Sequence, residues 1–212
     1  MIHQSPKVSS VTPKHGRVIT PPSRGVIAAE QGWWGLQEWH VNELEGGKNF
    51  PDLTAGPDRY EATDSPSDQP PADGLICSGG RLDERQRLNL TDRELIAEGK
   101  PVWPRIPVPA NKIIDIEWAY TMAHKTRGYV AFITKDGWNP DFAISRSQLE
   151  AKPFYENIYP EAPYWDNELP AKTHHQMVLP DHKKGHHVVV LLWLVADTGN
   201  AFYQTFDFDF GV

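Results

Sequence analysis

The last segment of the chain constrains its fold most, because two sets of side chains alternate strictly along it. The members of the two sets are Phe202, Gln204, Phe206, Phe208 and Phe210, and between them Ala201, Tyr203, Thr205, Asp207 and Asp209. A period of two is that of a β-strand, so we expect a half-buried strand with its phenylalanine side inward. Upstream of it, His186–Val195 is a nearly continuous apolar run, which predicts a central strand buried on both faces.

Three other segments have the composition of strands. Val18 and Ile19 begin a short one, and residues 112–120 and 129–134 are also rich in β-forming side chains. The eight Trp and nineteen Pro favour extended, loop-rich structure over a helix bundle, because proline breaks helix interiors. We therefore predict an all-β chain with an immunoglobulin/fibronectin III-like β-sandwich.

A long insertion, at about residues 30–100, interrupts this β pattern. Residues 30–44 have room for one or two helical turns, and residues 52–73 have the Asp, Pro, Ser and Gly content of a loop. Residues 92–99 predict a short helix, with Thr91 as its N-cap and Gly99 at its C-terminal end.

Length, charge and cysteine content limit the kind of protein. The chain has 212 residues and no internal repeat, and we expect a polar, flexible arm at 1–14 followed by a single domain at 15–212. The net charge of -7 argues against nucleic acid as a partner, and no apolar run is long enough to predict a membrane span. The single cysteine, Cys77, allows no intrachain disulfide.

The first ten residues lack the apolar core of a secretory signal peptide. Three explanations are open: a signal has been removed and replaced, the protein leaves the cell by another route, or it stays inside. We expect synthesis in the cytoplasm and export by a non-classical route, or secretion if the N-terminus has been altered.

The common hydrolase motifs are absent from the sequence. It contains neither a Gly-x-Ser-x-Gly elbow nor a His-Glu-x-x-His zinc motif. Asp207 and Asp209 are paired carboxylates on one strand face, where we expect them to be solvated. A hydrolase is therefore poorly supported.

Several blocks of sequence together resemble one family. They are His15-Gly16, the Glu45–Pro51 motif, 132–135, 173–176 and 197–204. The blocks resemble the chitin-binding type 4 domain, which is the family of the bacterial lytic polysaccharide monooxygenases (auxiliary activity family ten). The resemblance covers nearly all of residues 15–212.

The resemblance implies a copper site and oxidative chemistry. It places the copper ligands at His15, which supplies its α-amine and a ring nitrogen, and at His124, with one copper per chain. Imidazole and amine nitrogens suit copper. Phe202 matches the family's axial aromatic residue, and Glu45 matches the acid that positions the oxygen co-substrate. By themselves, two histidines far apart in sequence are weak evidence for a metal site, because histidine is more often a surface or hydrogen-bonded residue. The resemblance also implies an external electron donor.

The family's substrate face is flat and surrounds the copper. The residues that match positions on or beside it are Trp39, Thr121, His175, Asp197 and Asn200. This pattern resembles chitin-active members more than cellulose-active ones. From the residues alone, Trp39 could equally be buried under the Trp33–Trp34 cluster, and Asp197 and Asn200 could be turn residues before the last strand.

The chain departs from the family at three places. First, His15 follows Lys14, so its nitrogen is a peptide nitrogen without a free lone pair, and the standard site requires removal of residues 1–14. A trypsin-like protease could cut the Lys14–His15 bond. Second, Met122 stands where a small residue commonly lies near the copper. Third, cysteines of the family are replaced by large side chains, which we expect to pack in place of disulfides: Trp34, Tyr155 and Met177.

Two functions are consistent with these residues. The first is copper-dependent oxidative cleavage of crystalline polysaccharide, with chitin as the expected substrate, if His15 becomes the N-terminus. The second is a non-catalytic module that binds chitin or another glycan, such as the tip or cargo of a larger phage-tail or injection-type assembly. A free His15 amine and tight Cu(II) binding distinguish the first from the second.

Overall fold

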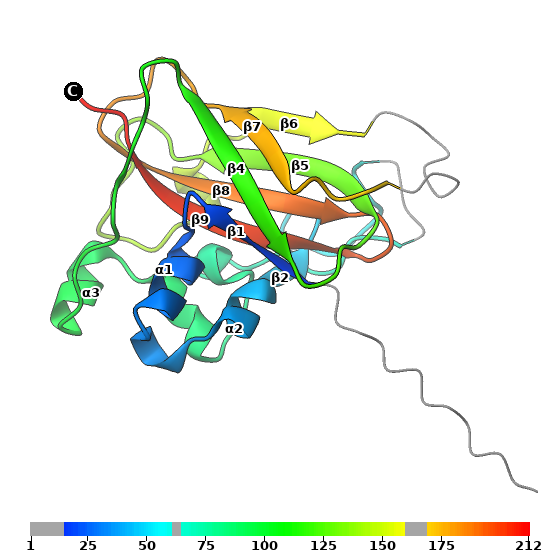
Figure 1. Ribbon diagram of the computed structural model, residues 1–212, viewed down its shortest axis with the longest axis horizontal. Helices are drawn as coiled ribbons and strands as arrows, with labels where there is room; N and C mark the ends of the chain where they lie inside the picture. Colours follow the sequence, from blue (N-terminus) through cyan, green and yellow to red (C-terminus); the bar gives the residue numbers. More distant parts are fainter. Residues whose placement is uncertain (1–14, 61–64, 160–168) are drawn as a thin grey trace, which may run out of the picture.

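Two sheets packed face to face form the body of the computed structural model, which describes residues 15–60, 65–159 and 169–212 (Figure 1). The predicted arm at 1–14 lies outside the described residues. The smaller sheet is antiparallel and has the order β1-β4-β7. Its strands are β1 (Gly16–Thr20), β4 (Ile113–Tyr120) and β7 (His174–Val178).

The larger sheet has six strands and contains the two predicted C-terminal strands at its centre. Its order is β2-β9-β8-β5-β6, and β3 runs parallel to β9. These strands are β2 (Glu45–Gly47), β3 (Ile106–Pro107), β5 (Thr126–Ile133), β6 (Tyr155–Ile158), β8 (His186–Val195) and β9 (Asn200–Asp209). The prediction of an all-β sandwich is confirmed.

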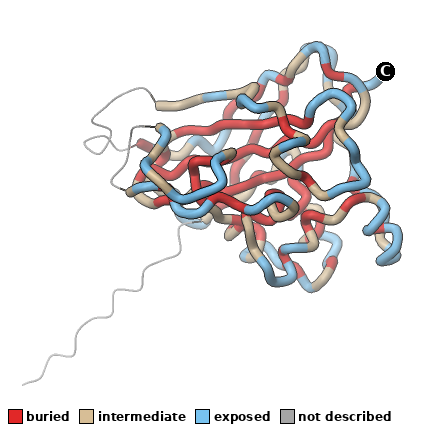
Figure 2. Tube along the Cα trace, turned by 180° about the vertical axis from the view of Figure 1, so that it is seen from behind, coloured by how far each residue is buried: buried red, intermediate tan, exposed pale blue. Residues whose placement is uncertain are grey.

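Strand β8 separates two hydrophobic cores. Leu191 and Trp193 point into the core between the two sheets, whereas Leu192 and Leu194 point into a second core on the opposite face. Every one of its residues from 187 to 195 is buried, as the apolar run predicts (Figure 2). Because β8 pairs with both β5 and β9, it is an interior strand of the larger sheet.

The insertion covers the outer face of the larger sheet. Helices α2 (Glu38–Asn42) and α3 (Asp92–Ala97) belong to it, and α1 (Arg24–Glu30) directly precedes it. Short 3-10 helices lie at η1 (Trp33–Gly35), η2 (Ile76–Ser78), η3 (Glu84–Asn89) and, between β5 and β6, η4 (Arg146–Gln148). The predicted helix at 92–99 is confirmed, since Thr91 forms a capping box with Glu94 and Gly99 has a φ of +70°.

This covering layer corrects the prediction for the last strand, which is buried on both faces rather than on one. Tyr203 and Thr205, on the side opposite the phenylalanines, are 0% and 2% exposed. The reason is that α1 and η2 pack against β9, so both faces of the strand meet protein.

The three large side chains that we expect in place of disulfides pack against the hydrophobic cores. Met177 is fully buried between the sheets, and Tyr155 packs at the edge of the same core. Trp34 packs against Trp33, with 5.6 Å between ring centroids. Cys77 is buried and free. Within the described residues, no helix has the length and apolar character needed to cross a membrane.

Candidate metal site

Four sequence-predicted site residues meet at one end of the sandwich. His15 lies directly before β1, and His124 lies in the turn between β4 and β5. The pairing of Gly16 with Tyr120 brings these two segments together. Glu45, at the start of β2, pairs with Phe202 near the start of β9.

The ring of Phe202 lies next to both imidazoles. Its centroid is 6.0 Å from that of His15 and 5.8 Å from that of His124. Phe202 is fully buried and stacks on Trp193 at 4.7 Å, and the indole nitrogen of Trp193 donates a hydrogen bond to Oγ1 of Thr126 at 2.8 Å. The two imidazoles therefore lie beside a buried aromatic ring that is itself packed against a second one.

Asp197 fixes the orientation of His124. Its Oδ1 lies 3.0 Å from Nδ1 of His124. An ionised carboxylate only accepts hydrogen bonds, so Nδ1 is the donor, and in the neutral imidazole the lone pair lies on Nε2. Within the part of the chain that the structure describes, no hydrogen bond to Nε2 is present. Asp197, which is predicted to bind substrate, therefore contacts the ring of a predicted metal ligand.

Thr121 holds the backbone of His15. Its amide and its hydroxyl both donate to the His15 carbonyl, at 2.9 and 3.1 Å. The ring nitrogen Nδ1 of His15 lies 3.7 Å from a carboxylate oxygen of Glu43, which in turn pairs with Arg85 at 3.3 Å. Arg85 also donates a hydrogen bond to the carboxylate of Asp83, and this bond is the main reason that the pKa of Asp83 is lowered to about 2.

Glu45 is held from two sides. Asn200 donates to its Oε1 at 3.0 Å, and the guanidinium of Arg81 lies 3.6 Å from its Oε2. Sequence reasoning assigned Asn200 to the substrate face and did not identify Arg81. Nothing local in the sequence points to Arg81, because it lies 36 positions from Glu45 and outside any recognised motif.

Trp39 is 52% exposed, so the alternative of burial under the Trp33–Trp34 cluster is wrong. Its ring stacks on His40 with 3.5 Å between centroids, and its indole nitrogen donates to Gln37 at 3.2 Å. Gln37 and His40 also form the capping box of α2. The exposed indole is therefore held by the start of its own helix. Met122 is also exposed.

His175 was predicted to bind substrate, and the structure corrects this. The residue is 9% exposed and lies between the sheets. Its Nε2 accepts a hydrogen bond from the indole of Trp118 at 3.0 Å, and its Nδ1 lies 2.9 Å from the hydroxyl of Tyr155. Burial lowers its pKa to about 4. The alternation along β7 explains the error, since His175 shares the inner face with Met177 while His174 faces outward.

Asp207 was predicted to be solvated, and this is also wrong. It is 3% exposed, and its carboxylate accepts hydrogen bonds from Arg24 at 2.6 and 2.9 Å. His186 and Arg105 lie 2.8 and 3.2 Å from its Oδ1. Asp209 is exposed as expected.

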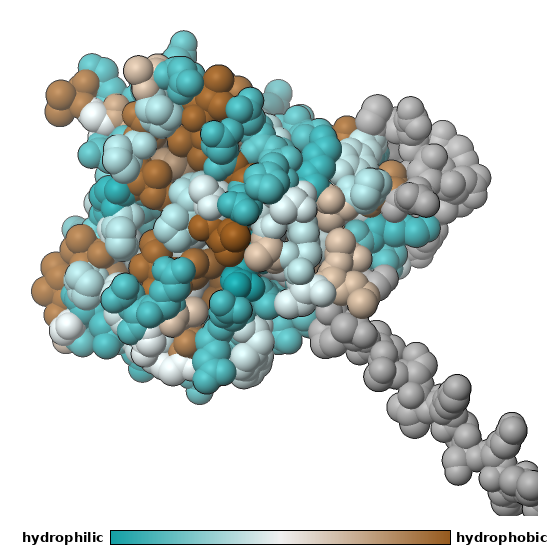
Figure 3. All heavy atoms as spheres, viewed as in Figure 1, coloured by the Kyte–Doolittle hydropathy of each residue, from teal (hydrophilic) through white to brown (hydrophobic). Residues whose placement is uncertain are grey.

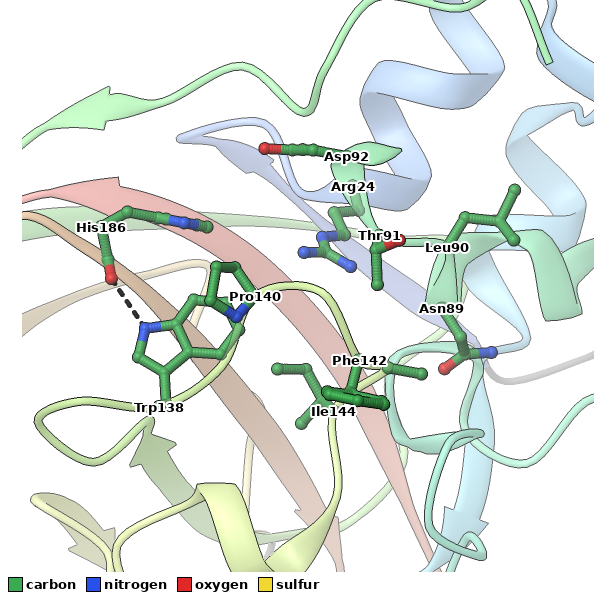
Figure 4. A pocket seen from close by; sticks show the side chains of 11 residues that line it. Arg24, Asn89, Leu90, Thr91, Asp92, Trp138, Pro140, Phe142, Ile144 and His186 are labelled. Carbon is green, nitrogen blue, oxygen red and sulfur yellow. Dashed lines mark hydrogen bonds between the residues drawn. The ribbon is translucent and has the colours of Figure 1, made fainter. Parts of the chain in front are cut away.

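A small cavity adjoins this buried cluster, with Arg24 and His186 in its lining (Figure 4). The indole of Trp138 closes one side and donates to the carbonyl of His186 at 2.8 Å. The cavity volume of about 10 Å³ is that of about one water molecule. It is too small for a substrate.

The donor atoms at that end fit copper in part. Two imidazoles are present, and among the described residues no group of three His, Cys, Asp or Glu side chains could hold a metal ion. The third nitrogen of a copper site would be the α-amine of His15, which becomes available once His15 is the first residue. Three nitrogen donors beside the apolar ring of Phe202 suit copper.

Comparison with known proteins agrees with this geometry. Residues 15–208 match the family model described as "Lytic polysaccharide mono-oxygenase, cellulose-degrading". The chain belongs to the lytic polysaccharide monooxygenase family. The match begins at His15, the residue that the geometry and the resemblance both assign to the metal site, and the resemblance stated from the sequence is confirmed.

Two solved structures show how closely the fold is shared. A chitin binding domain from Burkholderia pseudomallei is 41% identical, with a TM-score of 0.82, over 93% of this chain and 100% of that one. A family-ten lytic polysaccharide monooxygenase from Streptomyces lividans is 29% identical, with a TM-score of 0.70, over 92% of this chain and 100% of that one.

A longer relative is the GlcNAc-binding protein A of Shewanella oneidensis. It is 26% identical over 96% of this chain, but the match covers 37% of the relative. The chain therefore spans little more than a third of that protein's length.

Proposed function

We propose that the chain is a copper-dependent monooxygenase that cleaves chitin oxidatively when His15 is its first residue. The observation that carries this proposal is the placement of His15 and His124 over the buried ring of Phe202. Removal of residues 1–14 would add the third nitrogen donor. Action on chitin outside the cell would also require export of the chain.

Each polar residue of the site has a defined task in this proposal. His15 and His124 would hold the copper, which supplies one-electron redox chemistry when an external donor reduces it. Asp197 keeps the lone pair of His124 Nε2 available, and Thr121 fixes His15. Glu45, restrained by Asn200 and Arg81, would hydrogen-bond the oxygen co-substrate.

The choice of chitin rests on Trp39 and on the names of similar proteins. Trp39 presents a flat apolar ring to solvent, as a face that stacks on sugar rings requires. Two of the similar proteins are named for binding chitin or GlcNAc, whereas the family description mentions cellulose. Chitin and cellulose should therefore be compared directly.

The test uses two proteins: the chain beginning at His15, released from a cleavable fusion, and the full chain of 212 residues. Cu(II) binding is measured by calorimetry and electron paramagnetic resonance. Products from chitin and cellulose, with ascorbate and peroxide, are identified by mass spectrometry. We expect the His15-first protein to bind one Cu(II) and to release oxidised chitooligosaccharides.

A pair of matched variants locates the activity. His124→Ala should abolish tight Cu(II) binding and product formation. His174→Ala should change neither, because this histidine is 72% exposed on β7 and lies outside the site. Stoichiometric Cu(II) binding without oxidised products from either polysaccharide would refute the proposal.

A second candidate is a non-catalytic chitin-binding module, alone or within a larger assembly. It is favoured by one observation, that His15 is joined to Lys14 by a peptide bond in this sequence. Two results together would support it. The full-length chain would bind chitin as tightly as the His15-first protein, and the protein from its natural source would retain residues 1–14.

A further inference from the structure

Lys48 is fully buried beside the candidate site. Lysine is almost never fully buried unless its charge is paired, so its surroundings need an explanation. The ammonium donates hydrogen bonds to the carbonyls of Thr198 at 2.7 Å and Val195 at 3.3 Å. The carboxylate of Asp58 lies 3.4 Å away. One cation thus joins the end of β2, the loop after it and the turn between β8 and β9.

That turn is the segment that carries Asp197. The two carbonyls that Lys48 binds belong to the residues at positions 195 and 198, so the lysine grips the turn on both sides of Asp197. The backbone amide of Lys48 adds a third bond, to the carbonyl of Gly199 at 3.1 Å.

The opposite side of the same turn contacts the segment of His124. The amide of Ala196 donates to the carbonyl of Lys125 at 2.8 Å, and the carboxylate of Asp197 lies 3.0 Å from Nδ1 of His124. The turn therefore lies between Lys48 and His124, and movement of the turn would change the hydrogen bond that orients the imidazole.

A neutral side chain could not replace Lys48 without a cost. The two carbonyls would lose buried donors, and the carboxylate of Asp58, which is 5% exposed, would lose its counter-charge. Burial lowers the pKa of Lys48, and the charge of Asp58 opposes that shift.

We propose that Lys48 is a positioning residue that fixes the turn of Asp197 and thereby the orientation and tautomer of His124. The effect of Lys48 on copper binding rests on the function proposed above. The effect of Lys48 on His124 is independent of that function, because the hydrogen bonds involved are present without a metal.

The first measurement uses the metal-free full-length chain. The nitrogen chemical shifts of the His124 ring report which nitrogen carries the proton. We expect one tautomer, protonated at Nδ1, in the parent protein and a mixture in the Lys48→Met/Asp58→Asn double variant. The double variant removes both charges together, so it leaves no buried carboxylate unpaired and should still fold.

The second measurement uses the His15-first protein and Cu(II). Loss of a group that orients a metal ligand typically lowers affinity about 10–100-fold, and we expect a fall of that size in the double variant, with altered paramagnetic resonance parameters. If no variant or parent binds Cu(II) but the tautomer still shifts, the proposed function fails and the role of Lys48 stands.

Two control variants separate positioning from general destabilisation. Lys183→Met removes another buried lysine, which pairs with Glu150 at 2.7 Å and Asp136 at 3.0 Å away from this turn, and it should leave both readouts unchanged. Asp58→Asn keeps the ammonium and its two carbonyl acceptors, so it too should leave the tautomer unchanged. An unchanged tautomer and a Cu(II) affinity within about twofold in the double variant, or an equal effect of Lys183→Met, would overturn the proposal.

Discussion

The two ends of strand β9 differ in how many of their polar atoms are paired. At the far end, Asp207 accepts hydrogen bonds from Arg24 and Arg105 and lies 2.8 Å from Nε2 of His186. At the other end, His124 uses Nδ1 to contact Asp197 and has no hydrogen bond at Nε2 within the described residues. Each end holds an imidazole that contacts a carboxylate through one nitrogen, but within the described residues only the second places another imidazole, that of His15, beside the same aromatic ring.

This difference distinguishes polar groups that stabilise the fold from polar groups that are available to bind a ligand. Burial would raise the pKa of Asp207, but Arg24 and His186 outweigh it and hold the pKa well below its usual range. Such a group stays charged, paired and inert at neutral pH. Figure 3 shows hydrophobic residues interspersed with hydrophilic ones on the face seen in Figure 1. An unpaired nitrogen above an apolar ring is suited to metal binding.

The largest effect on stability is expected from a substitution at the far end. Asp207→Ala leaves the guanidinium of Arg24 buried without a counter-charge, so we expect a loss of about 3–5 kcal/mol in the free energy of unfolding. Urea denaturation at neutral pH measures it. Cu(II) affinity of the folded His15-first protein should not change.

The matched control for this variant is Asp209→Ala, on the same strand face but exposed. It should change the free energy of unfolding by no more than about 0.5 kcal/mol. Equal effects of the two substitutions would show that the buried pairing of Asp207 is not what stabilises this end.

A second prediction concerns His175, both of whose ring nitrogens have partners. Its pKa is lowered from 6.5 to about 4 by burial, so between these pH values the unfolded chain binds a proton that the folded chain does not. Stability therefore falls as the pH falls through this window, by about 3 kcal/mol at most. Urea denaturation at several pH values between 7 and about 4 measures the slope.

The variant His175→Gln separates this residue from the other titrating groups. It should be less stable than the parent at neutral pH, because the contacts of Trp118 and Tyr155 are altered, but its stability should depend less on pH. Parallel pH profiles for the two proteins would contradict the assignment of the slope to His175.

The fold was largely predictable because its strands have clear patterns. The apolar run of β8 gave its bounds, and Thr91 and Gly99 gave the ends of α3. The burial of Asp207 could not be predicted, because it depends on Arg24, which is 183 positions away and reaches β9 only when α1 folds over the sheet. A local period cannot show which face a distant insertion will cover.

The third prediction addresses the open end. Asp197→Ala removes the acceptor that orients His124, so Cu(II) affinity of the His15-first protein should fall about 10–100-fold, as measured by calorimetry. The free energy of unfolding should fall by less than about 1 kcal/mol, because the pair is partly exposed. A large loss of stability with unchanged Cu(II) affinity would make this end resemble the far end and would remove the contrast between them.

The site was predictable only where the family motifs reach. The resemblance identified His15, His124, Phe202 and Glu45, which the structure brings to one end. It did not show that Asn200 holds Glu45, since these residues are 155 positions apart. It also placed His175 on the substrate face, although the alternation of β7 turns that residue inward.

The smallest expected effect compares exposed aromatic residues near the two ends. Trp39→Ala should weaken chitin binding roughly fivefold, since a stacked aromatic ring contributes about 1 kcal/mol. Phe142→Ala is the matched control, because Phe142 is 65% exposed and lines the small cavity near Asp207. Binding of each variant to insoluble chitin, measured by depletion from solution, gives the comparison. Both variants should keep the parent's stability within about 0.5 kcal/mol, because neither ring is buried. If Phe142→Ala weakens binding as much as Trp39→Ala, chitin contacts both ends of the molecule, and the open end is not its only binding face.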